Sequence, residues 1–328
     1  MNNRKPLVSV LMCSYNPNLN FLRESIQSVL DQSYKFLEII FVNDGSTIDG
    51  LEDFIKSFND NRIVFVNNTE NKGLTKCLNQ GLKYCHGEFI ARMDDDDICM
   101  PLRIETQVNL MCEDDKINVL GTDTEVFGNE SRYSHYVLAD TREEQQVELF
   151  FKNVGLAHPT VMFRTDFLKK NNLSYDERYE KAQDYGLWVD CTYYDRLYCI
   201  DKVLLKYRTH SKQASQSSRD KQICAEKKIR INQLCRLGVN PTEKEVEMHQ
   251  NLCNGNMIAM VNDFDAFAKW IKKLVKNNKK TNYLDRKAFK RKLKKYFFLV
   301  CINYIKTQNI IKFAELFIKN INTFILIA

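Results

Sequence analysis

Residues 89–107, FIARMDDDDICMPLRIETQ, contain a short apolar run that ends in four consecutive aspartates. Phe89 to Met93 has the length and composition of a buried strand, and a helical pattern begins at Pro101. Four adjacent carboxylates repel one another, so a strand end tolerates them only if a cation offsets their charge. Mg²⁺ or Mn²⁺ fits such a set of oxygen ligands. The alternative is a solvated acidic turn in which Asp97 caps the following helix.

The residues before this stretch alternate apolar runs with helical patterns. Strands are predicted at 7–13, 37–42, 63–66 and 89–93, and helices at 22–30, 51–58 and 74–84. Such crossovers imply a parallel sheet with helices on both faces. Ligands of these sheets bind beyond the carboxyl ends of the strands, where this chain carries mostly polar residues.

After Pro101 the pattern loosens, and beyond Ser218 it becomes entirely helical. Helices are predicted at 101–113, 143–151 and 185–192, short strands at 119–121 and 161–163, and a hairpin-like pair at 197–207. We therefore expect a first domain over residues 1–220, with halves 1–100 and 101–220. A basic, amphipathic helical tail follows over 221–328.

Composition excludes several classes of protein. The chain has 328 residues, 44% of them hydrophobic, with 11 Gly and 5 Pro, so it is neither fibrous nor of low complexity. Eleven scattered Cys without a CxxC pair favour free thiols and a cytoplasmic protein. No signal peptide and no apolar run long enough to span a bilayer is predicted. Neither GxGxxG after the first strand nor GxxxxGK[ST] occurs, which disfavours dinucleotide oxidoreductases and P-loop NTPases.

The net charge of +6 is unevenly distributed. Thirteen Lys or Arg and one acidic residue lie between Lys269 and Lys295, so this segment carries +12 and the rest of the chain −6. An apolar stripe from Ile310 to Ile325 follows at helical spacing. This pairing predicts a helix lying on an anionic membrane surface, while packing of the stripe on protein or on a second subunit is the open alternative.

Seven motifs carry a resemblance to a known family. They are VSVLMCSYN, FVNDGS, ENKGL, FIARMDDDDICMPLRIETQ, HPTVMFR, AQDYGLW and KYRTHSKQASQ. In this order they resemble the family 2 glycosyltransferases of the GT-A fold, most of all bacterial β-1,3-N-acetylgalactosaminyl- or galactosyltransferases of lipooligosaccharide, O-antigen or capsule synthesis. The implied fold class is α/β, with a Rossmann-like, mostly parallel sheet between helices and a C-terminal helical extension.

The resemblance implies that residues 1–220 are the catalytic domain, with 1–100 binding the nucleotide sugar and 101–220 the acceptor. It also implies a role for individual residues. It assigns Mn²⁺ or Mg²⁺ to Asp96 and His210, and it implies that Arg103 holds the acidic loop. Asp95 stands where many relatives have Ala. His210 could instead be an ordinary surface histidine. The residues implied to bind the nucleotide sugar are Ser14, Tyr15, Asn16, Asp44, Lys72, Arg92, Asp94, Asp95 and Arg208, with Asp44 as the partner of the uracil.

The acceptor side is implied to contain Asp184 and His158. Asp184 is the expected general base, which must reach the acceptor hydroxyl while ionised. Relatives have a second acid before it, where this chain has Gln183. The alternatives are a helix cap for Asp184 and a turn residue for His158.

Together these observations predict an inverting, metal-dependent enzyme that moves a sugar from a UDP-sugar to a glycan or glycolipid hydroxyl. Its expected location is the cytoplasm, on the inner face of the plasma membrane, and a homo-oligomer is possible. One rival is a sugar-phosphate nucleotidyltransferase, which needs a glycine-rich loop where this chain has Ser14-Tyr15-Asn16-Pro17. A second rival is a nucleic-acid-binding protein that uses the basic tail, but we expect no nucleic-acid partner because this reading leaves the acidic residues unexplained.

Overall fold

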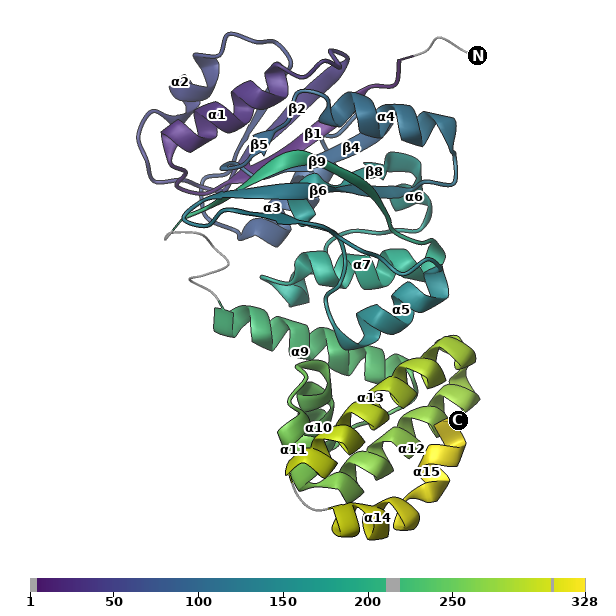
Figure 1. Cartoon of the computed structure of the whole chain (residues 1–328). Coiled ribbons are helices and arrows are strands. Elements are labelled where there is room, and N and C mark those ends of the chain that lie inside the picture. The colour runs from purple at the N-terminus through teal and green to yellow at the C-terminus, as the bar shows by residue number, and fades with distance from the viewer. Residues whose placement is uncertain (1–4, 211–218, 308–309, 328) are drawn as a thin grey trace. The chain divides into compact units, whose positions relative to one another are not determined.

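The computed structural model describes residues 5–210, 219–307 and 310–327 (Figure 1). It forms two compact units, one of residues 1–138 and 154–225 and one of residues 139–153 and 226–328. The second unit thus takes up a short segment from the middle of the chain. A functional division near residue 220 remains a proposal.

The first unit begins with the predicted alternation of strands and helices. β1 pairs in parallel with β2 and β4, and β2 with β3. α1, α2 and α4 share one apolar cluster on one face of the sheet, and α3 packs against β1 and β2. Figure 1 shows α3 on the opposite face, so helices cover both sides as expected. The bounds are β1 Val8–Ser14, α1 Leu19–Leu30, β2 Leu37–Asn43, α2 Leu51–Lys56, β3 Ile63–Asn67, α3 Leu74–Leu82 and β4 Phe89–Met93.

The second half of this sheet is mixed. The strand order is β3-β2-β1-β4-β8-β6-β9-β5, with β7 paired to β6. β8 runs antiparallel to both β4 and β6, whereas β9 runs parallel to β6. The bounds are β5 Ile98–Cys99, α4 Arg103–Glu113, β6 Val119–Gly128, β7 Arg132–Ser134, η1 His158–Thr160, β8 Met162–Arg164, α6 Thr165–Lys170, η2 Glu177–Tyr179, α7 Gln183–Tyr194 and β9 Tyr198–Thr209.

The predicted hairpin at 197–207 was wrong, because this stretch is the single strand β9. Its polar residues Asp201 and Lys202 suggest a turn, and both are exposed. They are extra residues in β9, because Thr122 of β6 pairs with Ile200 and the next residue, Asp123, pairs with Val203. The bulge absorbs the local distortion, so β9 continues without reversing.

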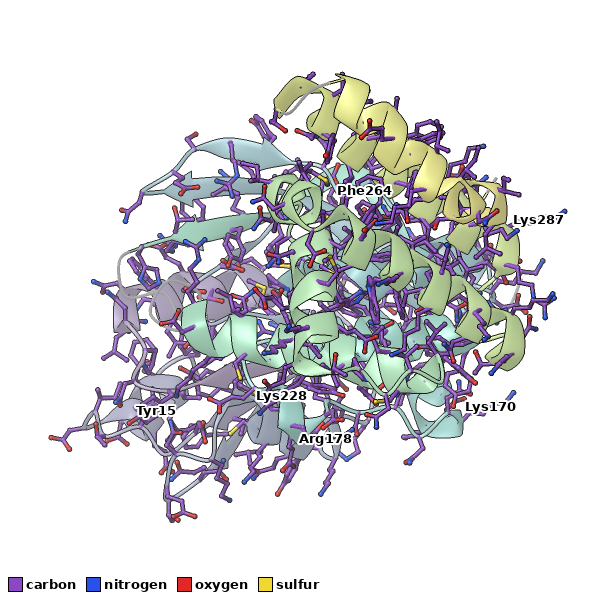
Figure 2. The ribbon with its side chains drawn as sticks, turned by 90° about the horizontal axis from the view of Figure 1, so that it is seen from below. Tyr15, Lys170, Arg178, Lys228, Phe264 and Lys287 are labelled. Atoms are coloured by element: carbon purple, nitrogen blue, oxygen red, sulfur yellow. The ribbon has the colours of Figure 1, made fainter. Side chains whose placement is uncertain are left out.

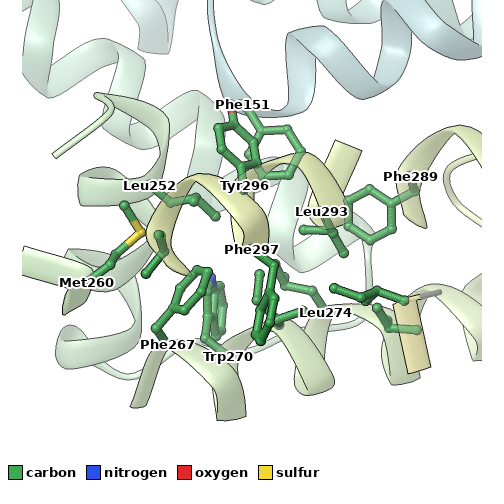
Figure 3. Close-up of a cluster of buried hydrophobic side chains, with 14 of the residues drawn as sticks. Phe151, Leu252, Met260, Phe267, Trp270, Leu274, Phe289, Leu293, Tyr296 and Phe297 are labelled. Atoms are coloured by element: carbon green, nitrogen blue, oxygen red, sulfur yellow. The ribbon is translucent and has the colours of Figure 1, made fainter. Parts of the chain in front are cut away.

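The second unit is helical. Its bounds are α5 Arg142–Phe151, most of α9 Arg219–Arg236, α10 Glu243–Cys253, α11 Met257–Asn262, α12 Phe264–Thr281, α13 Arg286–Thr307, α14 Ile310–Lys319 and α15 Ile321–Ile327. Phe264, at the start of α12, is 3% exposed and belongs to its core (Figure 2). Phe267, Trp270, Phe289 and Phe297 lie in the same buried cluster (Figure 3). Burial of these aromatic rings explains how helices rich in Lys and Arg still form a compact unit.

Part of the predicted amphipathic stripe packs on this core. Phe313 and Phe317 are half-buried against the apolar cluster, and Ile327 is 1% exposed. Ile318 and Ile325 remain 68% and 63% exposed. The side chain of Ile310 lies outside the described residues. For the two phenylalanines the structure therefore favours packing on protein over insertion into a membrane.

No helix among the described residues is long and apolar enough to cross a bilayer.

The buried His249 of α10 predicts a pH-dependent stability. It lies among the rings of Phe150, Phe151 and Trp270, at centroid distances of 5.4, 5.8 and 5.8 Å. Burial lowers its pKa to about 3. The unfolded chain takes up this proton below about pH 6.5, whereas the folded state does so only near pH 3. Stability is therefore lost as pH falls through this window, by about 2 kcal/mol at pH 5.

Urea unfolding at pH 7 and pH 5 measures this effect. The drop in the free energy of unfolding should be about 2 kcal/mol smaller in His249→Leu than in the wild type. Equal drops in the two proteins would contradict a neutral, buried His249.

Candidate active site

A cavity of about 790 Å³ lies in the first unit, beyond the carboxyl ends of β1, β2 and β4. The location agrees with the rule for open α/β sheets. The predicted site residues that line it are Ser14, Tyr15, Asn16, Asp44, Arg92, Asp94, Asp95, Asp96, His158, Asp184 and His210. Lys72 and Arg208 are not among the lining residues. Sequence reasoning missed further residues of the wall, such as Phe21, Arg132, Tyr136 and Lys181, because α1, β7 and two loops bring them in.

Asp44 directly follows β2 and holds the loop before α3. Its Oδ1 accepts a hydrogen bond from the Lys72 backbone N–H at 2.7 Å, and its Oδ2 accepts one from the Gly73 N–H at 2.9 Å. The Lys72 ammonium donates to Asn68 Oδ1 at 3.3 Å. Of this loop, Asn71 and Gly73 line the cavity. Asp44 is thus a loop anchor in this structure, and each of its oxygens keeps a second lone pair for a ligand.

The loop after β1 is tied to the loop after β2. Asn16, which has a positive φ of 49°, accepts a hydrogen bond from Thr47 N–H at 2.7 Å, and its own N–H donates to Ser46 Oγ at 2.9 Å. Gly45 has φ 68°, and a Cβ there would come within 2.2 Å of the Glu70 carbonyl carbon. Only glycine therefore fits at position 45. Tyr15 is 48% exposed at this rim (Figure 2).

The first two aspartates of the acidic turn have partners from other elements. Asp94 forms an ion pair with the guanidinium of Arg92, which is 1% exposed. The Asp94 carbonyl accepts from Ser25 Oγ of α1 at 2.8 Å. Asp95 accepts a hydrogen bond from Ser14 Oγ. The turn is therefore bound to both β1 and α1.

Asp96 and Asp97 meet the end of β9. Asp96 Oδ2 lies 2.9 Å from His210 Nε2. Asp97 is fully buried and its Oδ1 accepts from the Arg208 backbone N–H at 2.8 Å. The predicted cap was wrong, since α4 has Leu102 at its N-cap and no side-chain cap. Asp97 bonds to Arg208 of β9 instead of capping α4, and the sequence does not indicate that β9 lies next to this turn.

Burial raises the pKa of Asp95, Asp96 and Asp97. Desolvation brings the pKa of Asp95 to about 7, with the Asp96 charge adding to the effect. Burial and the charge of Asp94 raise the pKa of Asp96. Burial raises the pKa of Asp97 far more, and the charges of Asp94 and Asp96 add to the effect. The hydrogen bond from His210 opposes the shift at Asp96. A buried cluster with this excess of negative charge is stabilised by a cation.

The acidic residues fit a divalent cation. One carboxylate oxygen from each of Asp94, Asp96 and Asp97 lies within 4.8 Å of the others. Asp97 Oδ2 is buried without a hydrogen-bond partner among the described residues. Oxygen donors with one imidazole suit Mn²⁺, and oxygen donors alone suit Mg²⁺.

Arg208, near the end of β9, holds the acidic turn through its side chain. Its Nε donates to the Asp96 carbonyl at 2.7 Å, and its terminal nitrogen pairs with Glu24. The guanidinium carbon lies 4.3 Å from the Phe21 ring centroid and 4.5 Å from that of Phe127. The expected contact of Arg208 with a diphosphate would require these interactions to rearrange. Sequence reasoning missed Glu24, which carries no motif of its own.

Arg103 holds the strand before the turn. It is fully buried, donates to the Arg92 carbonyl at 2.8 Å and to Gln107 Oε1 at 3.1 Å. Gln107 in turn donates to the carbonyls of Leu120 and Thr160. This chain of hydrogen bonds joins α4 to β4, β6 and η1. The loop-holding role that the resemblance implied for Arg103 stays a prediction.

His158 faces the cavity from η1. Its Nε2 lies 2.8 Å from the Tyr175 hydroxyl, and burial lowers its pKa far below the ordinary value, so the ring is neutral near pH 7. The backbone of Tyr175 is held by Asn79 of α3, which both donates to its carbonyl and accepts from its N–H. Tyr175 was missed because a lone tyrosine in a loop carries no spacing signal.

Asp184 lies in the first turn of α7 and lines the same cavity. Its Oδ1 accepts from the Tyr185 N–H at 2.8 Å, and the N-cap of this helix is Ala182. The helix amino terminus favours an ionised carboxylate there. Gln183 also lines the cavity, and its Oε1 is buried without a hydrogen-bond partner among the described residues. Trp188, stacked on Phe163 at 6.0 Å, fixes the helix against β8.

The chain belongs to glycosyl transferase family 2. Residues 9–171 match the family of that description. An uncharacterized glycosyltransferase of Haemophilus influenzae is 33% identical over 241 residues, which cover 69% of this chain and 72% of the relative. An uncharacterized glycosyltransferase of Methanocaldococcus jannaschii is 33% identical over 208 residues, covering 62% and 71%.

Solved structures share the fold. S. aureus TarS in complex with UDP-GlcNAc superposes with a TM-score of 0.57 at 18% identity, covering 82% of this chain and 81% of that one. The mannosyltransferase PcManGT from Pyrobaculum calidifontis, with GDP-Man and Mn²⁺, has a TM-score of 0.54 at 12% identity, with coverages of 93% and 89%. The first unit is therefore a GT-A domain, and the chain is a glycosyltransferase.

Proposed function

We propose that this glycosyltransferase moves a sugar from a UDP-sugar to a hydroxyl of a bacterial surface glycan, with inversion at the anomeric carbon. The observation that carries the proposal is one cavity lined by the acidic turn, Asp94 to Asp96, and by the carboxylate Asp184. Charge neutralisation of a diphosphate and proton removal from an acceptor are the two requirements of the reaction. TarS bound to UDP-GlcNAc supports a uridine nucleotide, and the Mn²⁺ of PcManGT supports a divalent cation.

In this mechanism Asp184 accepts the proton of the acceptor hydroxyl. The acceptor oxygen forms a bond to the anomeric carbon while the bond from that carbon to the diphosphate oxygen breaks. The electron pair of the breaking bond leaves with UDP. Because the acceptor oxygen attacks the anomeric carbon directly, no covalent enzyme intermediate forms. A direct displacement of this kind inverts the anomeric centre, with oxocarbenium character at the transition state. His158, neutral near pH 7, can hold an acceptor or sugar hydroxyl without adding charge.

The donor would lie between the loops after β1, β2 and β4. Ser14, Tyr15, Asn16 and Asp44 line the part proposed for the nucleoside. Asp96 and His210 would hold the divalent cation, which when bound neutralises charge that develops on the diphosphate. Arg92 and the neighbouring Asp94 and Asp95 would face the sugar and ribose hydroxyls. The proposed location is the cytoplasm, because the proposed donor is a nucleotide sugar.

A donor screen tests the proposal. Full-length protein is incubated with Mn²⁺ and, separately, UDP-Glc, UDP-Gal, UDP-GlcNAc, UDP-GalNAc and GDP-Man, without acceptor, and nucleotide release is measured. We expect slow hydrolysis of one UDP-sugar at least about tenfold above the others, abolished by excess EDTA, because a matched sugar fills the pocket. Release of pyrophosphate from UTP and a sugar 1-phosphate would instead identify a nucleotidyltransferase. Hydrolysis of GDP-Man alone would overturn the uridine assignment.

A further inference from the structure

The long helix α13 presents two different sides. Phe289, Leu293, Phe297 and Val300 are buried in the cluster of the second unit, which fixes the rotation of the helix. The opposite side is formed by residues at helical spacing that remain exposed or half-exposed. They are Lys287, Arg291, Lys294, Lys295, Phe298, Leu299, Ile302 and Ile305, which we call the α13 outer face.

The α13 outer face changes from basic to apolar along the helix. Its first half carries only Lys and Arg, and Lys287 lies at the periphery of the unit (Figure 2). In its second half Phe298 is 43%, Ile302 47% and Ile305 40% exposed. Large apolar side chains grouped on one exposed helix side mark an interaction surface.

Most cations of α12 and of the first half of α13 form no ion pair among the described residues, and on the α13 outer face this holds for Lys287, Lys294 and Lys295. Within 269–295, Lys273, Arg291 and Lys292 form ion pairs with Glu245, Glu144 and Glu148. The other ten Lys and Arg of that segment have no ion pair among the described residues. The partner of this surface must therefore be both anionic and able to accept aliphatic side chains.

We propose that the α13 outer face docks on an anionic lipid bilayer, with the lysines at the headgroups and Phe298, Ile302 and Ile305 among the acyl chains. Interfacial binding combines these two contributions. A nucleic acid would pair with the cations but leave the aliphatic side chains in water. A second copy packed antiparallel would press lysines against the partner's apolar half without supplying carboxylates. The inference concerns the second unit and does not depend on the proposed reaction.

Vesicle co-sedimentation of the full-length protein tests the inference. The probes are vesicles of phosphatidylcholine alone and of phosphatidylcholine with phosphatidylglycerol at 3:1, at low and at high salt. We expect binding to the anionic vesicles only, weakened at high salt because screening shortens the range of the attraction. Phe298→Ser/Ile302→Ser and Lys294→Gln/Lys295→Gln should each weaken binding by roughly tenfold or more.

Matched controls separate this surface from general charge and hydrophobicity. Val137→Ser removes an apolar side chain that is 89% exposed, and Lys83→Gln/Lys116→Gln removes two exposed cations, all in the first unit. Both should bind as the wild type does. Unchanged melting temperatures show that the variants fold. Equal binding by all variants, or no binding to anionic vesicles, overturns the proposal. A changed molar mass in light scattering without any vesicle effect overturns it in favour of a second copy.

Discussion

Asp184→Asn is expected to lower kcat by roughly 10² to 10⁴ while the Kd for the UDP-sugar stays within about twofold. The asparagine retains the shape of the side chain and can still accept the hydrogen bond from Tyr185 N–H. It cannot take a proton from the acceptor hydroxyl, so only the chemical step suffers. Single-turnover transfer and calorimetric titration of the donor measure the two quantities separately.

Asp166→Asn is the matched control for this variant. Asp166 occupies the first turn of another helix, α6, and is exposed. Its replacement should leave kcat unchanged. If donor affinity instead collapses in Asp184→Asn, the carboxylate holds the pocket together and another group must be the base.

Asp96→Ala should lower transfer by roughly 10³ and abolish the dependence of UDP affinity on Mn²⁺. The substitution removes the oxygen beside His210 Nε2 and leaves Asp94 and Asp95 to repel a diphosphate. Titrating UDP with and without Mn²⁺ gives the second readout, which does not depend on catalysis.

Asp53→Ala, at an exposed position of α2, is the control and should keep both properties. Wild-type transfer that persists in excess EDTA would show that no divalent cation is required. Loss of transfer with an intact Mn²⁺ effect on UDP would move the cation away from Asp96.

The parallel half of the sheet could be predicted because its signals are local. Apolar runs such as Leu37 to Val42 are too short for helices, and each is followed by a stretch of helical period. Parallel strands bring their carboxyl ends to one edge, so the polar residues after β1, β2 and β4 had to lie together. The acidic turn was recognised as a candidate because its carboxylates carry the chemistry, whereas Asp184 was assigned from the resemblance to the family.

The sequence by itself thus determined the alternation of elements, the edge of the sheet that carries the site and the helical character of the tail. Only the tertiary structure decided that β9 is one strand and that Arg208 bonds to the acidic turn and pairs with Glu24. The same holds for His158 beside Tyr175 and for the side of α13 that remains exposed. These features depend on contacts between residues far apart in the chain, and periodicity reports only the local conformation of each segment.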